Sequence, residues 1–590
     1  MFRRAGTCSV ADAPLLESIV VIPVVATACD LAIRSVAQVP FAPRASDVAV
    51  STLIYLAAAS PALLVAALGW RGRLHGALLG VPFAVFTANL AFAFGARSRS
   101  ALAFALIGGL CLGIVSTRLR FRHLVFVGGG ASALLAWKVV AAPVRLADTP
   151  ETSFLLVVLD TTSAERLSTY GHDKDTSPHL TALANRGLLY QRALANAPWT
   201  LPSHVSMFTG LLPSELGFDG GFEFAFDGEV GTIAADLEKT KRCAVAISAN
   251  PMIPELTQMR RGFRHAWGVR QLTRSLPLVA LDRIRGREGF QSRGSRVTDL
   301  ALDWVDRVSP RGKPWFLFLN YLDPHAPYRP PASEKRRFAP EIDPDTVAED
   351  TQEYNSGRLP LTEEVRTAMG ALYDAEVAAV DAALGRLLKE LGARGYDDSN
   401  LLVIVTADHG ESLGDHGFVG HLLGMSDSVL HVPPVLAGPG VSRGQVAEAV
   451  QLVQLRSTLR TLLGLPPLAG IAPALPPWGE APEILVAEHP EPHWYARELA
   501  EFNDTAPRSL GNWVALERKG LKTLFNDHGE GFSYNLDRDP LEQHPQPLVE
   551  GREFVQAYLD RASRAQTKRQ VKISAETRWA LQQLGYLNKE

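Results

Sequence analysis

The chain has 590 residues, more than one hydrophobic core usually supports, so we expect at least two structural units. Its 59 basic and 62 acidic residues give a net charge of −3. This balance lacks the basic excess of nucleic-acid-binding proteins, so nucleic acid is excluded as a partner. Charges are few between Leu15 and Ala142 and ordinary after Pro150, which divides the chain into an apolar part and a part typical of soluble domains.

The apolar part contains five hydrophobic runs, near residues 15–33, 48–70, 77–95, 101–119 and 125–142. A membrane-spanning helix needs roughly 20 mostly apolar residues. Residues 1–145 are therefore predicted to be a membrane region with about five transmembrane helices. Glu17, Pro23 and Asp30 interrupt the first run, and a cleaved signal peptide is the alternative interpretation of that run.

Five spans would place the two ends of this region on opposite sides of the bilayer. Arginines are slightly more numerous in the loops on the N-terminal side, which favours an external position for the rest of the chain. We therefore predict a multi-pass protein of the cell (inner) membrane with a periplasmic or extracellular catalytic domain. The helices would serve as an anchor or would hold a lipid substrate near the active site.

Four continuous apolar runs follow a linker at residues 141–152, and each is followed by polar residues. FLLVVL (154–159) precedes Asp160, CAVAIS (243–248) precedes Asn250, WFLFLN (315–320) precedes Asp323 and His325, and LLVIVT (401–406) precedes Asp408 and His409. Continuous apolar strands are typical of a parallel sheet that is buried on both faces. Because ligands bind at the carboxyl ends of such strands, we expect these polar side chains to converge on one edge.

A helical pattern at residues 361–391, with apolar residues every three or four positions, alternates with these strands. The alternation predicts a doubly wound, mainly parallel α/β sheet. Residues 513–525 and 532–536 predict an antiparallel hairpin in a small C-terminal subdomain. The predicted organisation is a catalytic core at 152–470, then a C-terminal subdomain and helical tail at 471–590, with a surface insertion near the site at 333–361.

The segment APWTLPSHVSMFTG (197–210) places the hydroxyl of Thr200 just before Leu201 and Pro202. Proline is favoured in the first turn of a helix, so Thr200 is predicted to be an N-cap-like residue. That end of a helix attracts anions, and a sulfate or phosphate group would be held over the hydroxyl. A helix cap without function is the alternative, and the polar residues at the strand ends favour the functional interpretation.

Five blocks resemble the sulfatase family of the alkaline-phosphatase superfamily and occur in the order of that family. They are LDTTSAERLSTYG (159–171), the segment 177–217 that contains Thr200, LDPHAPY (322–328), TADHGESLGDHG (406–417) and LDRDPLEQ (536–543). The resemblance implies that Thr200 is the nucleophile, and that Asp160, Asp408 and His409 bind a metal ion beside the Thr200 hydroxyl, which completes the metal ligands. It also implies catalytic contacts of His325 and His421 with the transferring or leaving group. His204 and Asn250 are expected to bind the substrate.

The sequence departs from the pattern of enzymes that hydrolyse sulfate esters. Those enzymes carry Cys or Ser, oxidised to formylglycine, in a C/S-x-P-x-R motif, whereas this chain has Thr200 and, in place of the arginine, His204. Threonine cannot form that aldehyde because its β-carbon carries a methyl group. His409 stands where many calcium-binding members have Asn, and imidazole suits Zn²⁺ or Mn²⁺ better than Ca²⁺. We therefore expect one divalent ion, Mn²⁺ or Zn²⁺ in preference to Ca²⁺.

These departures favour the threonine-using relatives, which include phosphodiesterases, phosphatases, lipoteichoic acid synthases and phosphoethanolamine transferases. The predicted function is that of a membrane-bound, metal-dependent hydrolase or transferase of phosphate or sulfate esters, with phosphoryl transfer through a covalent Thr200 intermediate. The substrate would be a lipid or glycan head group. An arylsulfatase-like sulfuric ester hydrolase is the first alternative, and a non-catalytic sensing module is the second.

Overall fold

The computed structural model describes residues 152–491 and 511–548, with gaps at 219, 222–223, 226–229, 241, 256–259, 269–293, 308–312 and 527–529, and the pair Arg569–Gln570. All of them belong to a compact unit formed by Leu146–Val269 and Phe290–Glu590. Within this described part, no helix combines the length and the apolar character that crossing a membrane requires. The five runs predicted to be transmembrane helices lie outside the described residues.

An eight-stranded sheet with the strand order β12-β2-β11-β8-β1-β7-β5-β6 forms the centre of this unit. The four predicted apolar strands are its neighbouring central members, β8 (Leu401–Thr406), β1 (Ser153–Leu159), β7 (Trp315–Tyr321) and β5 (Cys243–Ser248). They are parallel to one another. All residues of β1, β7 and β8 are buried, which explains their continuous apolar composition. The predicted mixed α/β class with a mainly parallel sheet is confirmed.

The outer strands of the sheet are shorter. β6 (His265–Gly268) lies parallel to β5. On the other side, β11 (Val435–Ala437) runs antiparallel to both β8 and β2 (Leu188–Tyr190), and β12 (Gly444–Val446) lies parallel to β2. The sheet is therefore mixed at one edge and parallel at its centre, where the polar strand ends meet.

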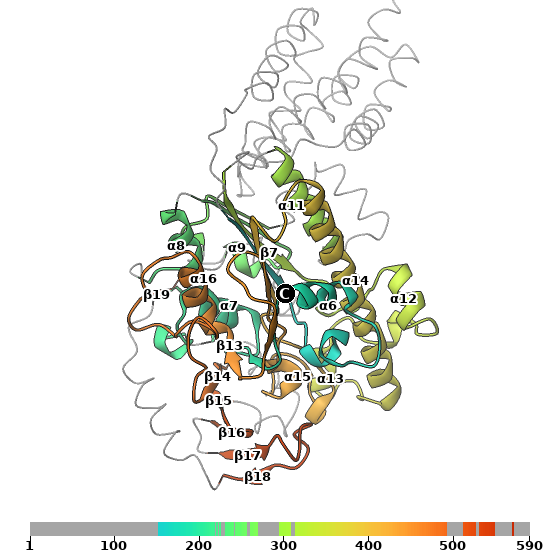
Figure 1. The fold of residues 1–590 in the computed structure, drawn as a ribbon. Coiled ribbons are helices and arrows are strands. Elements are labelled where there is room, and N and C mark those ends of the chain that lie inside the picture. The colour runs from blue at the N-terminus through green and yellow to red at the C-terminus, as the bar shows by residue number, and fades with distance from the viewer. Residues whose placement is uncertain are drawn as a thin grey trace, which may run out of the picture. The chain divides into compact units, whose positions relative to one another are not determined.

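Helices cover both faces of the sheet (Figure 1). One face carries α6 (Pro178–Arg186), α11 (Gly294–Arg307) and α14 (Glu363–Ala393), and the other carries α7 (Thr200–Thr209), α8 (Ile233–Lys239) and α16 (Leu455–Leu462). The helix predicted at 361–391 is confirmed as α14. It begins after Thr362, whose side chain caps the helix by accepting a hydrogen bond from the N–H of Val365.

The C-terminal antiparallel sheet has more strands than the predicted hairpin. The run 513–525 is two strands, β15 (Trp513–Arg518) and β16 (Leu521–Asn526), joined by a tight turn. Lys519 and Gly520 both have positive φ, 49° and 75°, which is typical of a two-residue type I′ turn. The sequence interpretation missed this turn because lysine at its first position is a weak signal.

Three further strands, β14 (Leu485–His489), β17 (Gly531–Asn535) and β18 (Gln546–Pro547), complete a sheet of the order β14-β15-β16-β17-β18. Arg569–Gln570, in the segment predicted to be a helical tail, forms the short strand β19, antiparallel to β4 (Phe224–Ala225). The predicted helix is therefore wrong at Arg569–Gln570, because these two residues pair with the strand β4. The remainder of the tail lies outside the described residues.

Buried charges join the C-terminal sheet to the core. Lys522 of β16 is fully buried. It donates a hydrogen bond to Asp427 of α15 (Asp427–Leu430) at 2.9 Å and forms an ion pair with Glu542 at 2.6 Å. Arg192 forms ion pairs with the same Asp427 and with Glu517 of β15. Because each buried charge has an opposite partner, the network holds α15 against the sheet.

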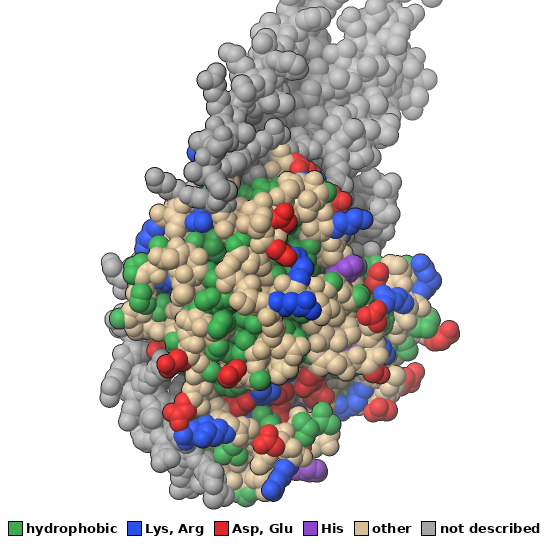
Figure 2. Space-filling model, in the orientation of Figure 1, with side chains coloured by type: hydrophobic (Ala, Val, Ile, Leu, Met, Phe, Trp, Pro, Cys, Tyr) green, Lys and Arg blue, Asp and Glu red, His purple; other side chains and the backbone are tan. Residues whose placement is uncertain are grey.

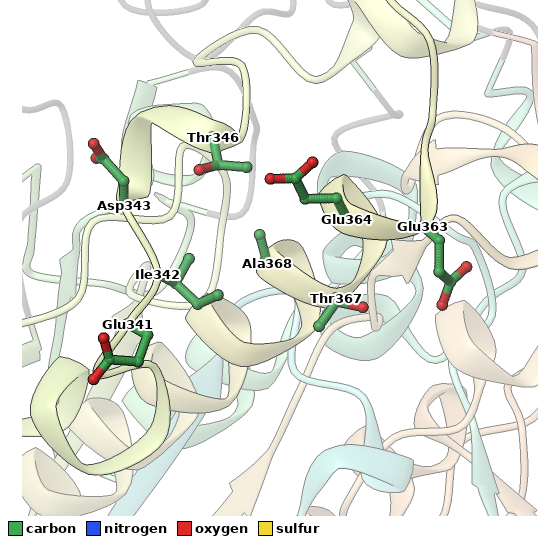
Figure 3. Close-up of a pocket in the computed structure, with 8 residues that line it drawn as sticks. All are labelled: Glu341, Ile342, Asp343, Thr346, Glu363, Glu364, Thr367 and Ala368. Carbon is green, nitrogen blue, oxygen red and sulfur yellow. The ribbon is translucent and has the colours of Figure 1, made fainter.

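The surface shows no continuous basic patch on the face drawn in Figure 2, where acidic and basic side chains are interspersed. A surface pocket of about 430 Å³ lies between the segment 341–346 and the first turns of α14 (Figure 3). Four of its eight lining residues, Glu341, Asp343, Glu363 and Glu364, are acidic. Because this lining would repel an anionic ester, the pocket is not suited to the predicted substrates.

Candidate active site

Three predicted metal ligands meet at the carboxyl edge of the central strands. Asp160 follows β1, and Asp408 and His409 follow β8. All three are fully buried, and one ligand atom of each lies within 4.8 Å of the others. This is the convergence that the parallel strands predict.

The donor atoms of this group fit a divalent cation. Oδ1 of Asp160 and Oδ2 of Asp408 are buried and have no hydrogen-bond partner among the described residues. Nδ1 of His409 donates to the carbonyl of Gly410 at 2.9 Å, which directs Nε2 toward the carboxylates. Two orphaned carboxylate oxygens beside an imidazole nitrogen form a set that a metal ion would satisfy.

The electrostatics of the group agree with this assignment. Burial first, and the neighbouring Asp160 second, raise the pKa of Asp408 well above its usual range. Burial, followed by the effect of His421, lowers the pKa of His409 well below its usual range, so this imidazole is neutral and keeps the lone pair that a ligand needs. A bound cation would relieve the repulsion between the two carboxylates.

The backbone around Asp160 is held in an uncommon conformation. Thr161 has a φ of 56°, which is rare for a β-branched residue, and its N–H donates to Oδ1 of Asp408 at 3.2 Å. Tyr373 of α14 donates its hydroxyl hydrogen to the carbonyl of Thr161 and accepts the N–H of Ser163 at 3.1 Å. These contacts link the two ligand-bearing strand ends, so Asp408 is held relative to Asp160.

Two asparagines fix the carboxylate of Asp160. Nδ2 of Asn250 and Nδ2 of Asn320 both donate to Oδ2 of Asp160, at 3.0 and 3.1 Å. Oδ1 of Asn250 accepts the N–H of Met252, so both ends of the Asn250 amide have protein partners. The assignment of Asn250 to substrate binding stays a prediction, and its contact in the structure is with Asp160, a predicted metal ligand.

Thr200 reaches the same site from α7. Its Oγ1 lies 3.3 Å from Nε2 of His409. The helix is anchored there because Ser203 donates its hydroxyl hydrogen to the carbonyl of Asp408 at 2.6 Å. The hydroxyl of Thr200 therefore lies beside the metal group, as a nucleophile activated by that metal requires.

The predicted cap position of Thr200 is wrong by one residue. Trp199 is the N-cap, with an extended backbone, and Thr200 is the first residue of α7. Pro202 has no N–H, and the N–H of Ser203 bonds to the carbonyl of Trp199 at 3.3 Å. The N–H groups of Thr200 and Leu201 are therefore the donors that this helix end can offer to an anion.

The rings of His421 and His325 lie next to that of His409, one of the candidate metal-binding residues. The ring centroid of His421 lies 4.5 Å from that of His409 and 5.1 Å from that of His325. His325 donates from Nδ1 to the carbonyl of Ala326 at 2.6 Å. The two predicted proton donors, His325 and His421, are thus adjacent.

Glu411 contacts one of these histidines, with its Oε1 3.1 Å from Nδ1 of His421. Burial raises the pKa of Glu411 to about 8 and lowers the pKa of His421 to about 3. In both groups burial therefore favours the neutral form. Sequence reasoning overlooked Glu411, although its place between His409 and His421 in TADHGESLGDHG was a usable signal.

His204 and Asp323 differ in how they relate to the site. His204 is fully buried in α7, donates from Nδ1 to the carbonyl of Thr200 at 2.9 Å, and lies 3.3 Å from Oδ2 of Asp408. Its role in anion binding stays a prediction.

Asp323 was expected at the converging edge, but its Oδ1 accepts the N–H of Gly294 at the start of α11. Asn320, inside β7, contacts Asp160 instead, and its polar side chain in an apolar strand was the missed signal.

A metal-binding group beside a nucleophilic hydroxyl at a helix N-terminus is an arrangement suited to metal-assisted cleavage of anionic esters. The family comparison is more particular, because the family model described as Sulfatase matches residues 152–233 and 254–465. The chain therefore belongs to the sulfatase family, a family of metal-dependent hydrolases.

Individual relatives are similar over most of their length. An uncharacterised sulfatase, YidJ, of Escherichia coli K12 is 21% identical over 66% of this chain and 82% of its own length. Human iduronate 2-sulfatase is 24% identical over 66% of this chain and 90% of its own. The crystal structure of a phosphonate monoester hydrolase of Agrobacterium radiobacter superposes with a TM-score of 0.53 and 21% identity, covering 70% of this chain and 94% of that one. At this identity the structural match supports the fold alone.

Proposed function

We propose that the protein transfers a phosphoryl group from a phosphate ester to water or to another hydroxyl, through a covalent bond to Thr200. The observation that carries this proposal is the 3.3 Å separation between Oγ1 of Thr200 and Nε2 of His409, one of the three buried metal-binding residues. A threonine at this position cannot be converted to the formylglycine on which sulfate-ester hydrolysis in this family depends.

The divalent ion, for which Mn²⁺ or Zn²⁺ is favoured over Ca²⁺ because of the His409 imidazole, would lower the pKa of the hydroxyl and neutralise substrate charge. The hydroxyl of Thr200 gives its proton to solvent, and Oγ1 forms a bond to phosphorus while the bond from phosphorus to the leaving oxygen breaks; Thr200 takes a proton back when the phosphoryl group is released. The N–H groups of Thr200 and Leu201 hold an oxygen of the transferring group. His325 or His421 gives a proton to the leaving oxygen, and an incoming hydroxyl then releases the phosphoryl group from Thr200.

Sulfate-ester hydrolysis is the second candidate function. It is favoured by the relatives, since several of them are named as sulfatases, including the human iduronate 2-sulfatase. In this chain it would require direct attack by the threonine hydroxyl, because the oxidisable Cys or Ser is replaced by Thr200. Sulfated glycans would then be the substrate class.

We further propose that residues 1–145 anchor the enzyme in the cell membrane with the catalytic domain outside the cytoplasm. The support is the five apolar runs and the slight arginine bias of their loops. A membrane position would bring the site near lipid or glycan head groups. A hydroxyl-bearing acceptor in that setting would make the enzyme a transferase, and water would make it a hydrolase.

The proposal is tested with the full chain, purified in detergent and assayed with added Mn²⁺ or Zn²⁺. Turnover of p-nitrophenyl phosphate, bis(p-nitrophenyl) phosphate and p-nitrophenyl sulfate is compared for wild type, Thr200→Ala and Thr200→Ser. We expect turnover of the phosphorus esters, a loss of at least about 10³-fold in Thr200→Ala, and partial retention in Thr200→Ser, which keeps the hydroxyl.

Thr209→Ala is the matched control, because Thr209 is a buried threonine at the other end of α7 whose hydroxyl donates to the carbonyl of Val205 and accepts the N–H of Leu211. Mass spectrometry of the acid-quenched enzyme should find one added phosphoryl group on the peptide that contains Thr200. Full activity of Thr200→Ala would refute the covalent mechanism. Turnover of the sulfate ester alone would favour the second candidate.

A further inference from the structure

The contact between Glu411 and His421 is produced by a short ribbon beside the site. β9 (Ser412–Leu413) and β10 (Val419–Gly420) pair antiparallel, with Gly420 opposite Ser412 and Val419 opposite Leu413. Glu411 immediately precedes β9 and His421 immediately follows β10, so the two side chains continue this pairing by one step. The register of the ribbon therefore brings the carboxyl group to the imidazole.

Further contacts fix the register. Asn355, in α13 (Gln352–Asn355), accepts the N–H of Val419 at 2.8 Å and donates to its carbonyl at 2.7 Å. Ser412 donates its hydroxyl hydrogen to the carbonyl of Phe418 at 2.7 Å. Gly420 has a φ of 87°, a conformation that favours glycine, just before the backbone reaches His421. The ribbon is thus held by its own bonds and by α13, independently of Glu411.

Glu411 itself has no structural partner that would explain its burial. Its side chain is fully buried, Oε1 contacts His421, and Oε2 has no hydrogen-bond partner among the described residues. A buried carboxyl group with one orphaned oxygen costs stability, so a role in the site is a better explanation than a role in packing.

We infer that Glu411 is a positioning residue for the reaction: by binding Nδ1 of His421, it turns Nε2 of that ring toward the leaving oxygen. This inference rests on the proposed function, in which the leaving oxygen takes a proton. As the bond between phosphorus and the leaving oxygen breaks, that oxygen takes the proton from Nε2. Glu411 keeps its contact with Nδ1 throughout, so no further reactant is needed. Water that releases the phosphoryl group from Thr200 returns the proton.

The test compares two phosphate monoesters that differ in their need for a proton. An alkyl phosphate must be protonated as its alcohol leaves, whereas p-nitrophenolate leaves as an anion. We expect Glu411→Leu to lower kcat/KM for the alkyl ester by about 10²-fold, the range of general acid catalysis, and for p-nitrophenyl phosphate by less than about tenfold. Ser412→Ala is the control, because it removes a bond of the same ribbon and should lower both rates by one common factor.

A double-mutant cycle keeps the inference testable if Glu411→Leu does not fold. Glu411→Gln has nearly the same volume, and it is combined with His421→Ala. If Glu411 acts through His421, adding Glu411→Gln to His421→Ala causes no further loss with the alkyl ester. Equal losses for the two leaving groups, or independent losses in the cycle, overturn the inference.

The outcomes separate this inference from the proposed function. Wild type that turns over neither phosphate ester refutes the proposed function. If wild type cleaves only sulfate esters, the same comparison is made with an alkyl sulfate and p-nitrophenyl sulfate. The positioning role of Glu411 is then judged by the same ratio of losses.

Discussion

Replacing Lys522 with methionine tests whether buried charges hold the C-terminal sheet to the core. The Lys522 ammonium lies 2.9 Å from Asp427 and 2.6 Å from Glu542, and its side chain is fully buried. Burial alone would raise the pKa of Asp427, yet Lys522 and Arg192 lower it well below its usual range. Burial would likewise lower the pKa of Lys522, and the two carboxylates raise it instead. The lysine is therefore charged and stabilises both anions.

The distances give the size of the effect. At an effective dielectric constant near 20, each pair attracts by about 6 kcal/mol before the cost of removing the charges from water is subtracted. That cost is several kcal/mol per ion and cancels most of the attraction. The intact network therefore stabilises the fold little more than apolar side chains in the same place would. Removing Lys522 alone leaves Glu542 without its cation and should lower the free energy of unfolding by about 3–5 kcal/mol.

Urea denaturation followed by tryptophan fluorescence measures the change. The same substitution at Lys519, an exposed residue of the adjoining turn, is the control and should change the free energy by less than about 0.5 kcal/mol. Adding Glu542→Gln to Lys522→Met should restore part of the loss, because it removes the uncompensated charge. A loss below about 1 kcal/mol, or a double variant no more stable than the single one, would show that the network does not act in this way.

Three more expectations follow from the same contacts. The folded-state pKa of Asp427 lies below its unfolded value of about 3.9, so its stabilisation is present above that pH and is lost as the pH falls below it. Urea curves between about pH 5 and pH 2 should therefore show the difference in unfolding free energy between wild type and Lys522→Met narrowing on acidification, and a constant difference over this range would contradict the assignment. Mn²⁺ or Zn²⁺, added at about 100 times its Kd for the site, should raise the free energy of unfolding of wild type by about 2.7 kcal/mol, and removing the ion with a chelator should reverse the increase. Asp408→Asn should respond to the metal much less, and an equal response would place the ion elsewhere. Asn355→Ala should destabilise by about 1–3 kcal/mol, because it leaves two backbone groups of β10 unpaired, and unchanged stability in urea would refute that role.

The sequence by itself determined the central sheet and the ligands at its edge. Continuous apolar runs predict strands that are buried on both faces, and polar residues directly after parallel strands must share one edge. The convergence of Asp160, Asp408 and His409 was predicted in this way, because their positions depend only on strand direction, and the resemblance to the sulfatase family added their metal-binding role. The helical period of α14 was also readable from the sequence, because the apolar pattern recurs along a helix of 31 residues.

Only the tertiary structure decided the contacts that depend on register or on distant parts of the chain. Glu411 meets His421 because two short strands pair in one particular register, and neither strand is long enough to show a pattern. Tyr373 reaches Thr161 across 212 positions of sequence, and Asn320 turns toward Asp160 from within an apolar strand. Such contacts depend on how elements pack against one another, and no local periodicity encodes that packing. The candidate metal-binding residues were therefore predictable from the chain, whereas the residues that contact them, and Glu411 beside His421, were not.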